Sequence, residues 1–344
     1  MVNVRKFVAL TLILLLTAAI AAGCGETKTA GGDNTKKKLK IGVIYLTAEH
    51  PYYQAHAKQT QAYAKEKGIE LVELDGKADQ ANMTTQMENL IAQKVDGIIY
   101  ALLEPKAASA DINEAQQAGI PVATFAIKHD PAIAKAPFVG IPESDAGALG
   151  GEEAAKTFQK KFPDKAPVLC LIDSIGIKPV NDRIDGFVKG FQKVLPNAKI
   201  AGRLDGKSKK DVALNVTEDF LQKNSDANVF YGGNGDMSLG ALAALEARGR
   251  GTSATELVVS HDGSEPEVLK IMDPNSALKL AVANKPKELA RATVDTLLEI
   301  INGKREMTNT DDILVNAALI NGDNLAESQT FLKDEYFSNL QLQK

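Results

Sequence analysis

Short apolar runs alternate with longer segments of helical periodicity along most of the chain. The predicted strands are 41–46, 70–74, 97–102, 121–126, 138–141, 168–172, 200–204, 228–231, 256–260, 278–283 and 313–320. Between them, apolar residues recur every three or four positions, as in the segment that carries Met83, Met87 and Leu90. This alternation is typical of βαβ units, and so many strands exceed one comfortable twisted sheet. We therefore predict an α/β fold with two doubly wound parallel sheets.

Glycines punctuate this pattern at the expected helix ends. A glycine follows the last residue of four periodic segments, at Gly68, Gly119, Gly249 and Gly303. A residue with left-handed backbone conformation, usually glycine, often ends a helix at this position. A strand, helix and strand recur as 97–125 and again as 228–261. We expect this weak internal repeat to reflect two similar halves.

The first residues have the pattern of an export signal. Arg5 and Lys6 precede an apolar run over 7–20, which ends in small residues directly before Cys24. The run is short for a membrane span, and small residues before a cysteine resemble the lipobox of bacterial lipoproteins. The resemblance implies that 1–23 are removed and that Cys24 carries the lipid. An uncleaved anchor with an incidental cysteine is the alternative.

Composition excludes some classes of partner. The chain has 344 residues, with 40 Lys and Arg against 44 Asp and Glu, so nothing indicates the basic surface that nucleic-acid binding needs. Residues 24–38 are polar and small, which predicts a flexible tether. The length suits two domains. Cys170 lies in an apolar run, so we expect a buried thiol.

The stretch 40–54 carries the first candidate site. An apolar run ends at Leu46, and a polar bend then brings His50, Tyr52 and Tyr53 to the start of a helix. Ligands of open α/β sheets bind just past the carboxyl ends of the strands. Aromatic faces bind the C–H face of a sugar. The alternative is that the two tyrosines only pack.

Four later positions offer polar groups. Arg183 is predicted in the first turn of a helix, where the helix dipole disfavours a cation; it either donates to ligand oxygens or is a solvated surface residue. Asn234 stands in a glycine-rich loop and presents a donor and an acceptor. Asp262, after a strand, either accepts from ligand hydroxyls or only forms a turn before Gly263, and Asn284 is equally ambiguous.

Catalytic and cofactor motifs are missing from the sequence. The four histidines have no metal-ligand spacing, no nucleophile elbow occurs, and the glycines of the Asn234 loop do not fit a dinucleotide fingerprint. Residues 202–208 are one residue short of a phosphate loop and predict a turn. We therefore expect no enzyme, no metal and no cofactor.

Taken together, these segments resemble bacterial periplasmic sugar-binding proteins of the ribose and galactose type, which capture substrates for ABC importers. The resemblance covers about residues 40–320. The matching motifs are His-Pro-Tyr-Tyr at 50–53, Gly-Ile-Pro-Val at 119–122, Asn-Asp-Arg-Ile-Asp-Gly-Phe at 181–187, Asp-Met-Ser-Leu-Gly-Ala-Leu at 236–242 and His-Asp-Gly at 261–263.

The resemblance implies two α/β lobes joined by three crossovers, with the ligand between them. The crossovers are expected near 141–144, 284–285 and 311–313. The expected first lobe is 39–142 with 285–312, and the second lobe is 143–284 with 313–323. Residues 324–344 form a C-terminal extension.

The family's ligand contacts carry over to nine positions. They are His50, Tyr52, Tyr53, Ala126, Ile127, Arg183, Asn234, Asp262 and Asn284. Two of these depart from the family, because ribose-type members have an Asp-Arg pair where this chain has Ala126 and Ile127. Their polar residue after the third strand corresponds here to Ala101. Losing these groups removes several hydroxyl contacts, which speaks against plain ribose. Either the ligand is less hydroxylated, or it binds through His50 and the neighbouring backbone instead.

The resemblance implies a lipid-anchored, extracytoplasmic, monomeric protein that closes around a small sugar or polyol and delivers it to a permease with its ATPase. The first alternative is a sensor that reports the same ligand to a membrane receptor or kinase. A transcriptional regulator shares this fold but would need a DNA-binding headpiece where the export signal stands.

Overall fold

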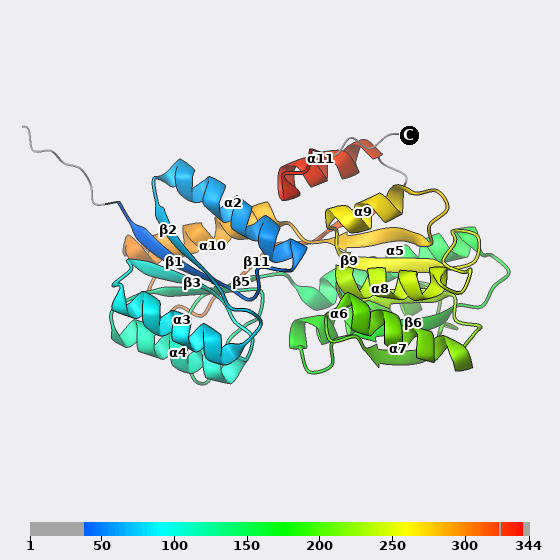
Figure 1. Ribbon diagram of the computed structural model, residues 1–344, viewed down its shortest axis with the longest axis horizontal. Coiled ribbons are helices and arrows are strands. Elements are labelled where there is room, and N and C mark those ends of the chain that lie inside the picture. Colours follow the sequence, from blue (N-terminus) through cyan, green and yellow to red (C-terminus); the bar gives the residue numbers. More distant parts are fainter. Residues whose placement is uncertain (1–37, 323–324, 340–344) are drawn as a thin grey trace, which may run out of the picture. The chain divides into compact units, whose positions relative to one another are not determined.

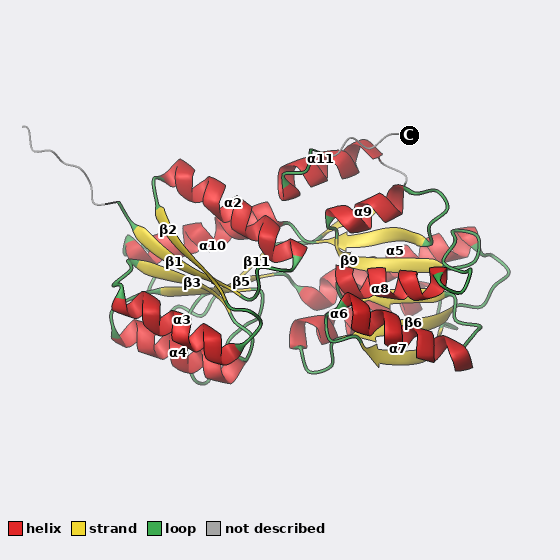
Figure 2. Ribbon diagram, in the orientation of Figure 1, coloured by secondary structure: helices red, strands yellow, loops and turns green. Residues whose placement is uncertain are grey.

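The computed structural model describes residues 38–322 and 325–339. The described residues from Leu39 onward form one compact unit. The export signal, Cys24 and nearly all of the predicted tether lie outside the described residues. Within this unit, helices and strands alternate and build two separate sheets (Figures 1 and 2). No helix among the residues that the structure describes is long and apolar enough to cross a membrane.

The first sheet is fully parallel. Its order is β11-β5-β4-β3-β1-β2. Its strands are β1 (Lys40–Tyr45), β2 (Glu70–Asp75), β3 (Gly97–Ala101), β4 (Val122–Phe125), β5 (Phe138–Gly140) and β11 (Asp312–Leu314), and its helices are α2 (Pro51–Lys67), α3 (Gln80–Ala92), α4 (Pro105–Gln117) and α10 (Pro286–Ile301). Every residue of β3 and β4 is buried, since helices cover both faces of the sheet. That is why these strands are continuous apolar runs.

The second sheet repeats the order of the first as β12-β10-β9-β8-β6-β7. Its strands are β6 (Val168–Asp173), β7 (Lys199–Asp205), β8 (Val229–Gly232), β9 (Leu257–Asp262), β10 (Leu278–Ala283) and β12 (Ala318–Asn321), and its helices are α5 (Glu143–Lys161), α6 (Lys178–Val194), α7 (Lys210–Lys223), α8 (Gly235–Glu246) and α9 (Glu265–Met272). Only β12 runs antiparallel to its neighbour. The predicted internal repeat is explained, because β3-α4-β4 and β8-α8-β9 occupy equivalent places.

Three segments connect the sheets. Two lie where the sequence predicts them, between β5 and α5 and between β10 and α10. The third differs. The single predicted strand 313–320 is wrong, because β11 pairs with β5 whereas β12 pairs with β10, so the chain crosses at 315–317. Asn316 is the one polar residue in the run 313–320, and a single asparagine did not distinguish a crossing from a continuous strand.

Several local predictions are confirmed and others need correction. Gly68, Gly119, Gly249 and Gly303 all have positive φ at helix ends, and Cys170 is a buried free thiol. The start predicted for α6 is wrong, because this helix begins at Lys178 with a proline in its first turn. Its arginine therefore lies in the second turn, where the helix dipole has little effect.

The chain ends in α11 (Leu325–Tyr336). This helix contacts α2 and α10 beside the first sheet and α9 beside the second. Figure 1 shows α11 between α2 and α9. Within the predicted C-terminal extension, α11 is therefore packed against helices of both sheets.

Candidate functional site

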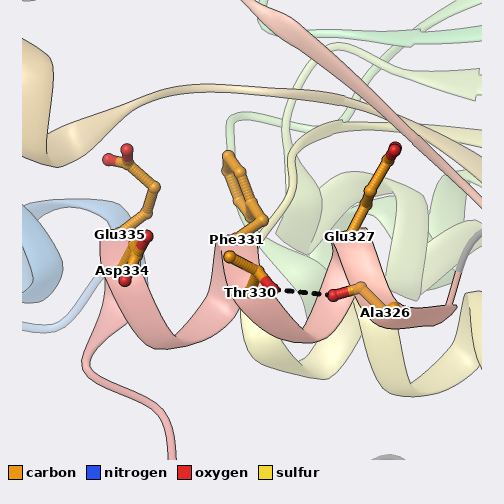
Figure 3. A pocket seen from close by; sticks show the side chains of 6 residues that line it. All are labelled: Ala326, Glu327, Thr330, Phe331, Asp334 and Glu335. Carbon is orange, nitrogen blue, oxygen red and sulfur yellow. Dashed lines mark hydrogen bonds between the residues drawn. The ribbon is translucent and has the colours of Figure 1, made fainter.

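A cavity of about 350 Å³ lies between the carboxyl ends of the two sheets. All nine predicted ligand-binding residues line it: His50, Tyr52, Tyr53, Ala126, Ile127, Arg183, Asn234, Asp262 and Asn284. A second hollow, of about 410 Å³, runs along α11. Figure 3 shows that all its labelled side chains come from that single helix. With no opposing wall, the hollow does not enclose a ligand, so we take the cavity between the sheets as the candidate site.

The first wall of the cavity is built on the start of α2. His50 caps this helix, because its Nδ1 accepts a hydrogen bond from the Tyr52 N–H at 3.2 Å. Tyr52 and Tyr53 meet edge to face, with ring centroids 5.1 Å apart. Burial raises the pKa of both phenols, so they stay protonated and act as hydrogen-bond donors. Neither hydroxyl has a hydrogen-bond partner among the residues of the described chain, so both remain available to a ligand.

The same wall is apolar where β3 and β4 end. Ala126 and Ile127 follow β4, and Leu103 follows β3. Ala126 has a φ of 66°, a left-handed conformation that is uncommon for alanine. Ala101, which we expected at the position of a polar contact, is instead buried inside β3. Leu103 takes that place on the cavity wall.

An ion pair dominates the second wall. Arg183 Nε and Nη2 donate to the two carboxylate oxygens of Glu143 at 2.6 and 2.8 Å. The Arg183 Nη1 donates to the Gly233 carbonyl at 3.1 Å. The Arg183 side chain is only 12% exposed, so it is not the solvated surface arginine of the alternative interpretation. Burial raises the pKa of the Glu143 carboxyl, and the adjacent guanidinium opposes this effect.

Glycines in α5 and α6 bring the two partners together. A Cβ atom on Gly147 of α5 would stand 2.2 Å from the Arg183 carbonyl oxygen, and one on Gly186 of α6 would stand 2.1 Å from the Ser144 carbonyl oxygen. Such contacts are impossible for any other residue, so the helices approach closely only because these positions are glycines. The close packing places the start of α5, with Glu143, beside Arg183.

Asp262 ends β9 and is held from several sides. Its Oδ1 accepts from the Asn284 amide at 2.9 Å, and its Oδ2 accepts from the Gly235 N–H at 3.1 Å. His50 Nε2, on the first wall, lies 3.7 Å from the same Oδ2. The carboxylate is therefore part of a polar network and does more than form a turn. The contact between His50 and Asp262 joins the two walls of the cavity.

The remaining amides have mixed roles. Asn234 caps α8, since its Oδ1 accepts from the Met237 N–H at 2.8 Å. Part of its hydrogen-bonding capacity is therefore used within the protein. The Asn284 Oδ1 is buried without a partner among the described residues. A buried acceptor of this kind needs a donor, and the His261 side chain is one candidate, since its interaction with Asn284 opposes the lowering of the His261 pKa.

Sequence reasoning missed two carboxylates of the second wall, Glu143 and Asp236. Burial raises the pKa of Asp236, the neighbouring His50 opposes the shift, and the negative charge of Asp262 adds to it. An acid in the first turn of a helix is common for dipole reasons alone, so neither residue stood out. The glycines spaced four residues apart in α5 and in α6 could have predicted that these helices pack closely, and so that Glu143 lies beside Arg183. Among the described residues, no group of His, Cys, Asp and Glu is arranged to hold a metal.

Comparisons with known proteins agree with this geometry. The family of periplasmic binding protein domains matches residues 41–305. The ribose import binding protein RbsB of Bacillus subtilis is 27% identical over 299 residues, which are 87% of this chain and 93% of that protein. The fructose import binding protein FruE of Bifidobacterium longum is also 27% identical, over 86% of this chain and 90% of that protein.

Solved structures share the fold. A periplasmic solute-binding protein of an ABC transporter from Actinobacillus succinogenes, with bound D-allose, superposes with a TM-score of 0.75 at 23% identity, over 85% of this chain and all of that chain. A solute-binding protein from Bacillus halodurans with bound myo-inositol gives a TM-score of 0.74 at 21% identity, over 86% of this chain and 98% of that chain.

Proposed function

The chain belongs to the family of periplasmic binding protein domains, and on this premise we propose that it captures one small sugar or polyol outside the cytoplasm and delivers it to the permease of an ABC importer. Its relatives are binding proteins, and the chain is a binding protein rather than an enzyme. The ligand class is proposed from the chemistry of the cavity.

The contrast between the two walls carries the proposal. One wall presents the rings of Tyr52 and Tyr53, and the other presents the Arg183–Glu143 pair and Asp262. A sugar or polyol has a C–H face that packs on aromatic rings and hydroxyls that bond to carboxylates and guanidinium groups. Such a ligand satisfies both walls at once, whereas a purely apolar ligand would leave buried polar groups unpaired.

Relatives indicate the range of ligands to test. By name or bound ligand, they handle ribose, fructose, D-allose and myo-inositol. Ala126 and Ile127 replace a polar pair of the ribose type, so we propose a ligand that places few hydroxyls on the first wall. A deoxy sugar, or a polyol whose hydroxyls gather on one edge, has this property.

We further propose that the two sheets belong to lobes that close by hinge motion. The first lobe comprises 39–142 and 285–312, and the second comprises 143–284 and 313–323. Because β11 pairs with β5, the first lobe is better extended to Leu314. Closure over the ligand would exclude water from the ion pair and strengthen its hydrogen bonds.

We also propose that Cys24 carries the lipid that holds the protein at the membrane and that the protein is a monomer. The charged, apolar and small residues before Cys24 support the anchor. The mass of the N-terminal peptide from membrane-extracted protein would check it, since an unmodified Cys24 or an uncleaved leader contradicts the proposal. Sedimentation of residues 25–344 would check the monomer.

The test is a ligand panel on residues 25–344. The panel contains D-ribose, 2-deoxy-D-ribose, D-fructose, D-allose, L-arabinose, myo-inositol and glycerol, with L-leucine as the unrelated control. A compound at 100 times its Kd stabilises the folded state by about 2.7 kcal/mol, which raises the melting temperature by several degrees. We expect a saturable shift with a sugar or polyol, confirmed by titration calorimetry at one site. A shift with L-leucine alone, or with no compound, would overturn the proposed ligand class.

A further inference from the structure

Helix α11 is attached to both sides of the molecule, although it lies beyond residue 305, where the family match ends. On the side of the first sheet, the Gln59 amide of α2 donates to the Asp334 and Glu335 carbonyls at 2.6 and 2.9 Å. The Lys287 N–H, in the first turn of α10, donates to the Glu335 carboxylate at 2.7 Å. A carboxylate at a helix N-terminus is favourable, so this end of α11 is fixed to the first sheet.

The apolar face of α11 is fixed to the other sheet. Leu332 and Tyr336 are buried in the core cluster that also contains Val268 and Ile271 of α9. Figure 3 shows Glu327, Phe331 and Glu335 projecting from the same side of α11. Their spacing of four places them on one face of the helix. The helix therefore contacts α2 and α10 beside the first sheet and α9 beside the second.

One contact of α11 reaches the ligand cavity from behind. The Tyr336 hydroxyl donates to the Asp262 backbone carbonyl at 2.9 Å. That carbonyl also accepts from the Asn284 N–H at 2.9 Å. Tyr336 itself does not line the cavity. Its hydroxyl thus acts on the backbone of a cavity residue without facing a ligand.

Asp262 is a residue whose backbone needs such support. Its φ is 107°, which L side chains rarely adopt. This conformation turns the carboxylate toward Asn284 and the Gly235 N–H. A strained conformation persists only where surrounding contacts hold it. The two donors on its carbonyl are contacts of that kind, and one of them comes from α11.

We propose that Tyr336 is a positioning residue for ligand binding: its hydroxyl, carried by α11, holds the Asp262 backbone so that the carboxylate keeps its place on the cavity wall. This positioning gives α11 a role in affinity. This role in affinity rests on the proposed function, which defines the class of ligand. The effect of Tyr336 on the Asp262 backbone needs no ligand. A structural role alone would stabilise the fold without acting selectively on Asp262.

The test compares two Tyr→Phe variants. Tyr336→Phe keeps the ring in the core and removes only the donor to Asp262. Tyr63→Phe is the matched control, because the Tyr63 hydroxyl donates to both Asp295 oxygens at 2.9 Å, between α2 and α10 and away from the cavity. Hydrogen exchange is measured without ligand on peptides covering 257–264 and 283–286. Affinity for D-allose and myo-inositol is measured by calorimetry.

We expect Tyr336→Phe to speed exchange in these two segments and to weaken binding of whichever probe binds the wild type by about three- to tenfold, the effect of one hydrogen bond. Tyr63→Phe should leave both readings unchanged even if its melting temperature falls as far. Unchanged exchange at 257–264 in Tyr336→Phe, or an equal change in Tyr63→Phe, would overturn the proposal.

A second variant guards against a local packing effect of the new phenylalanine. Gln59→Ala leaves Tyr336 intact but removes the tie between α2 and the end of α11. Looser attachment of α11 should also speed exchange at 257–264, by a smaller factor, and unchanged exchange there contradicts the role of the helix. If neither D-allose nor myo-inositol binds the wild type, these two probes are excluded as ligands, and the exchange measurements still decide the positioning role.

Discussion

The two lobes place the same structural positions at the cavity and fill them with opposite chemistry. β4 and β9 occupy equivalent places in their sheets. Ala126 follows β4, Asp262 ends β9, and both residues have positive φ. At this shared left-handed position, one lobe carries a methyl group and the other a hydrogen-bonded carboxylate. The fold therefore sets where a side chain meets the ligand, and the residue sets what the contact does.

The same contrast recurs at the next pair of strands. Leu103 lines the cavity after β3, whereas Asn234 lines it after the equivalent β8. Asn234 also caps α8 with its side chain, while the helix after β3 has no side-chain cap. One lobe thus offers an apolar, aromatic surface that excludes water, and the other offers directional polar contacts. Discrimination among ligands is expected to come from the polar lobe, because an unmet polar group costs more than an unfilled apolar surface.

The largest expected effect comes from removing the polar half of the comparison. Asp262→Ala should weaken ligand binding about 100-fold, because it removes a charged hydrogen-bond acceptor and leaves Asn284 and the Gly235 N–H without their partner. Titration calorimetry with the compound of the panel that binds best measures the loss. Asp312→Ala is the control, since Asp312 pairs with Lys128 outside the cavity. A loss below about threefold for Asp262→Ala would mean that the second wall does not direct binding.

A pH experiment tests whether a buried neutral histidine changes the free energy of unfolding to a similar extent in each lobe. Burial lowers the pKa of His56, in the first lobe, to about 3 and that of His261, in the second lobe, well below its usual range, with the Arg183 charge adding to the latter shift. Below about pH 6.5 the unfolded chain binds protons that the folded chain does not. The stability that each histidine contributes is therefore complete above that pH and is lost as the pH falls.

Lowering the pH from 7 to 5 should reduce the free energy of unfolding by about 2 kcal/mol on account of His56. His261 should act in the same direction. Glu267 acts in the opposite direction, because burial and the Asp262 charge raise its pKa to about 8, so only differences between variants are informative. His56→Phe keeps a ring stacked on Phe125, and its loss of stability from pH 7 to pH 5 should be about 2 kcal/mol smaller than that of the wild type. The loss should also be smaller for His261→Phe. Urea unfolding at both pH values measures the differences, and a smaller loss in only one variant would show that the lobes are unlike in this respect.

The smallest expected effect comes from giving the apolar lobe a polar group. Ala126→Asn suits the left-handed backbone, because asparagine tolerates positive φ better than most residues. One new hydrogen bond should raise the ratio of affinities for D-ribose over 2-deoxy-D-ribose by about fivefold. Competition calorimetry measures the ratio. The exposed Ala132→Asn serves as control, and an unchanged ratio in Ala126→Asn would mean that this position does not face the ligand.

Much of the fold follows from local patterns in the sequence. Apolar runs marked the strands, and the glycines at helix ends marked where helices stop, since both depend on neighbouring residues and on the backbone angles of single positions. The aromatic pair at Tyr52 and Tyr53 was found because it directly follows a predicted strand. The internal repeat was detectable because two equivalent βαβ segments keep similar patterns.

The tertiary structure decided what depends on distant segments meeting. The pairing of Arg183 with Glu143 needs two helices packed at glycines, and the left-handed backbone of Asp262 needs donors from Asn284 and from Tyr336 at the far end of the chain. The crossing at 315–317 is likewise set by which strand each half of one apolar run joins. Hydrophobic periodicity states that a segment is buried but not against which partner. The partners, and with them the ligand cavity, are fixed only when the two sheets assemble.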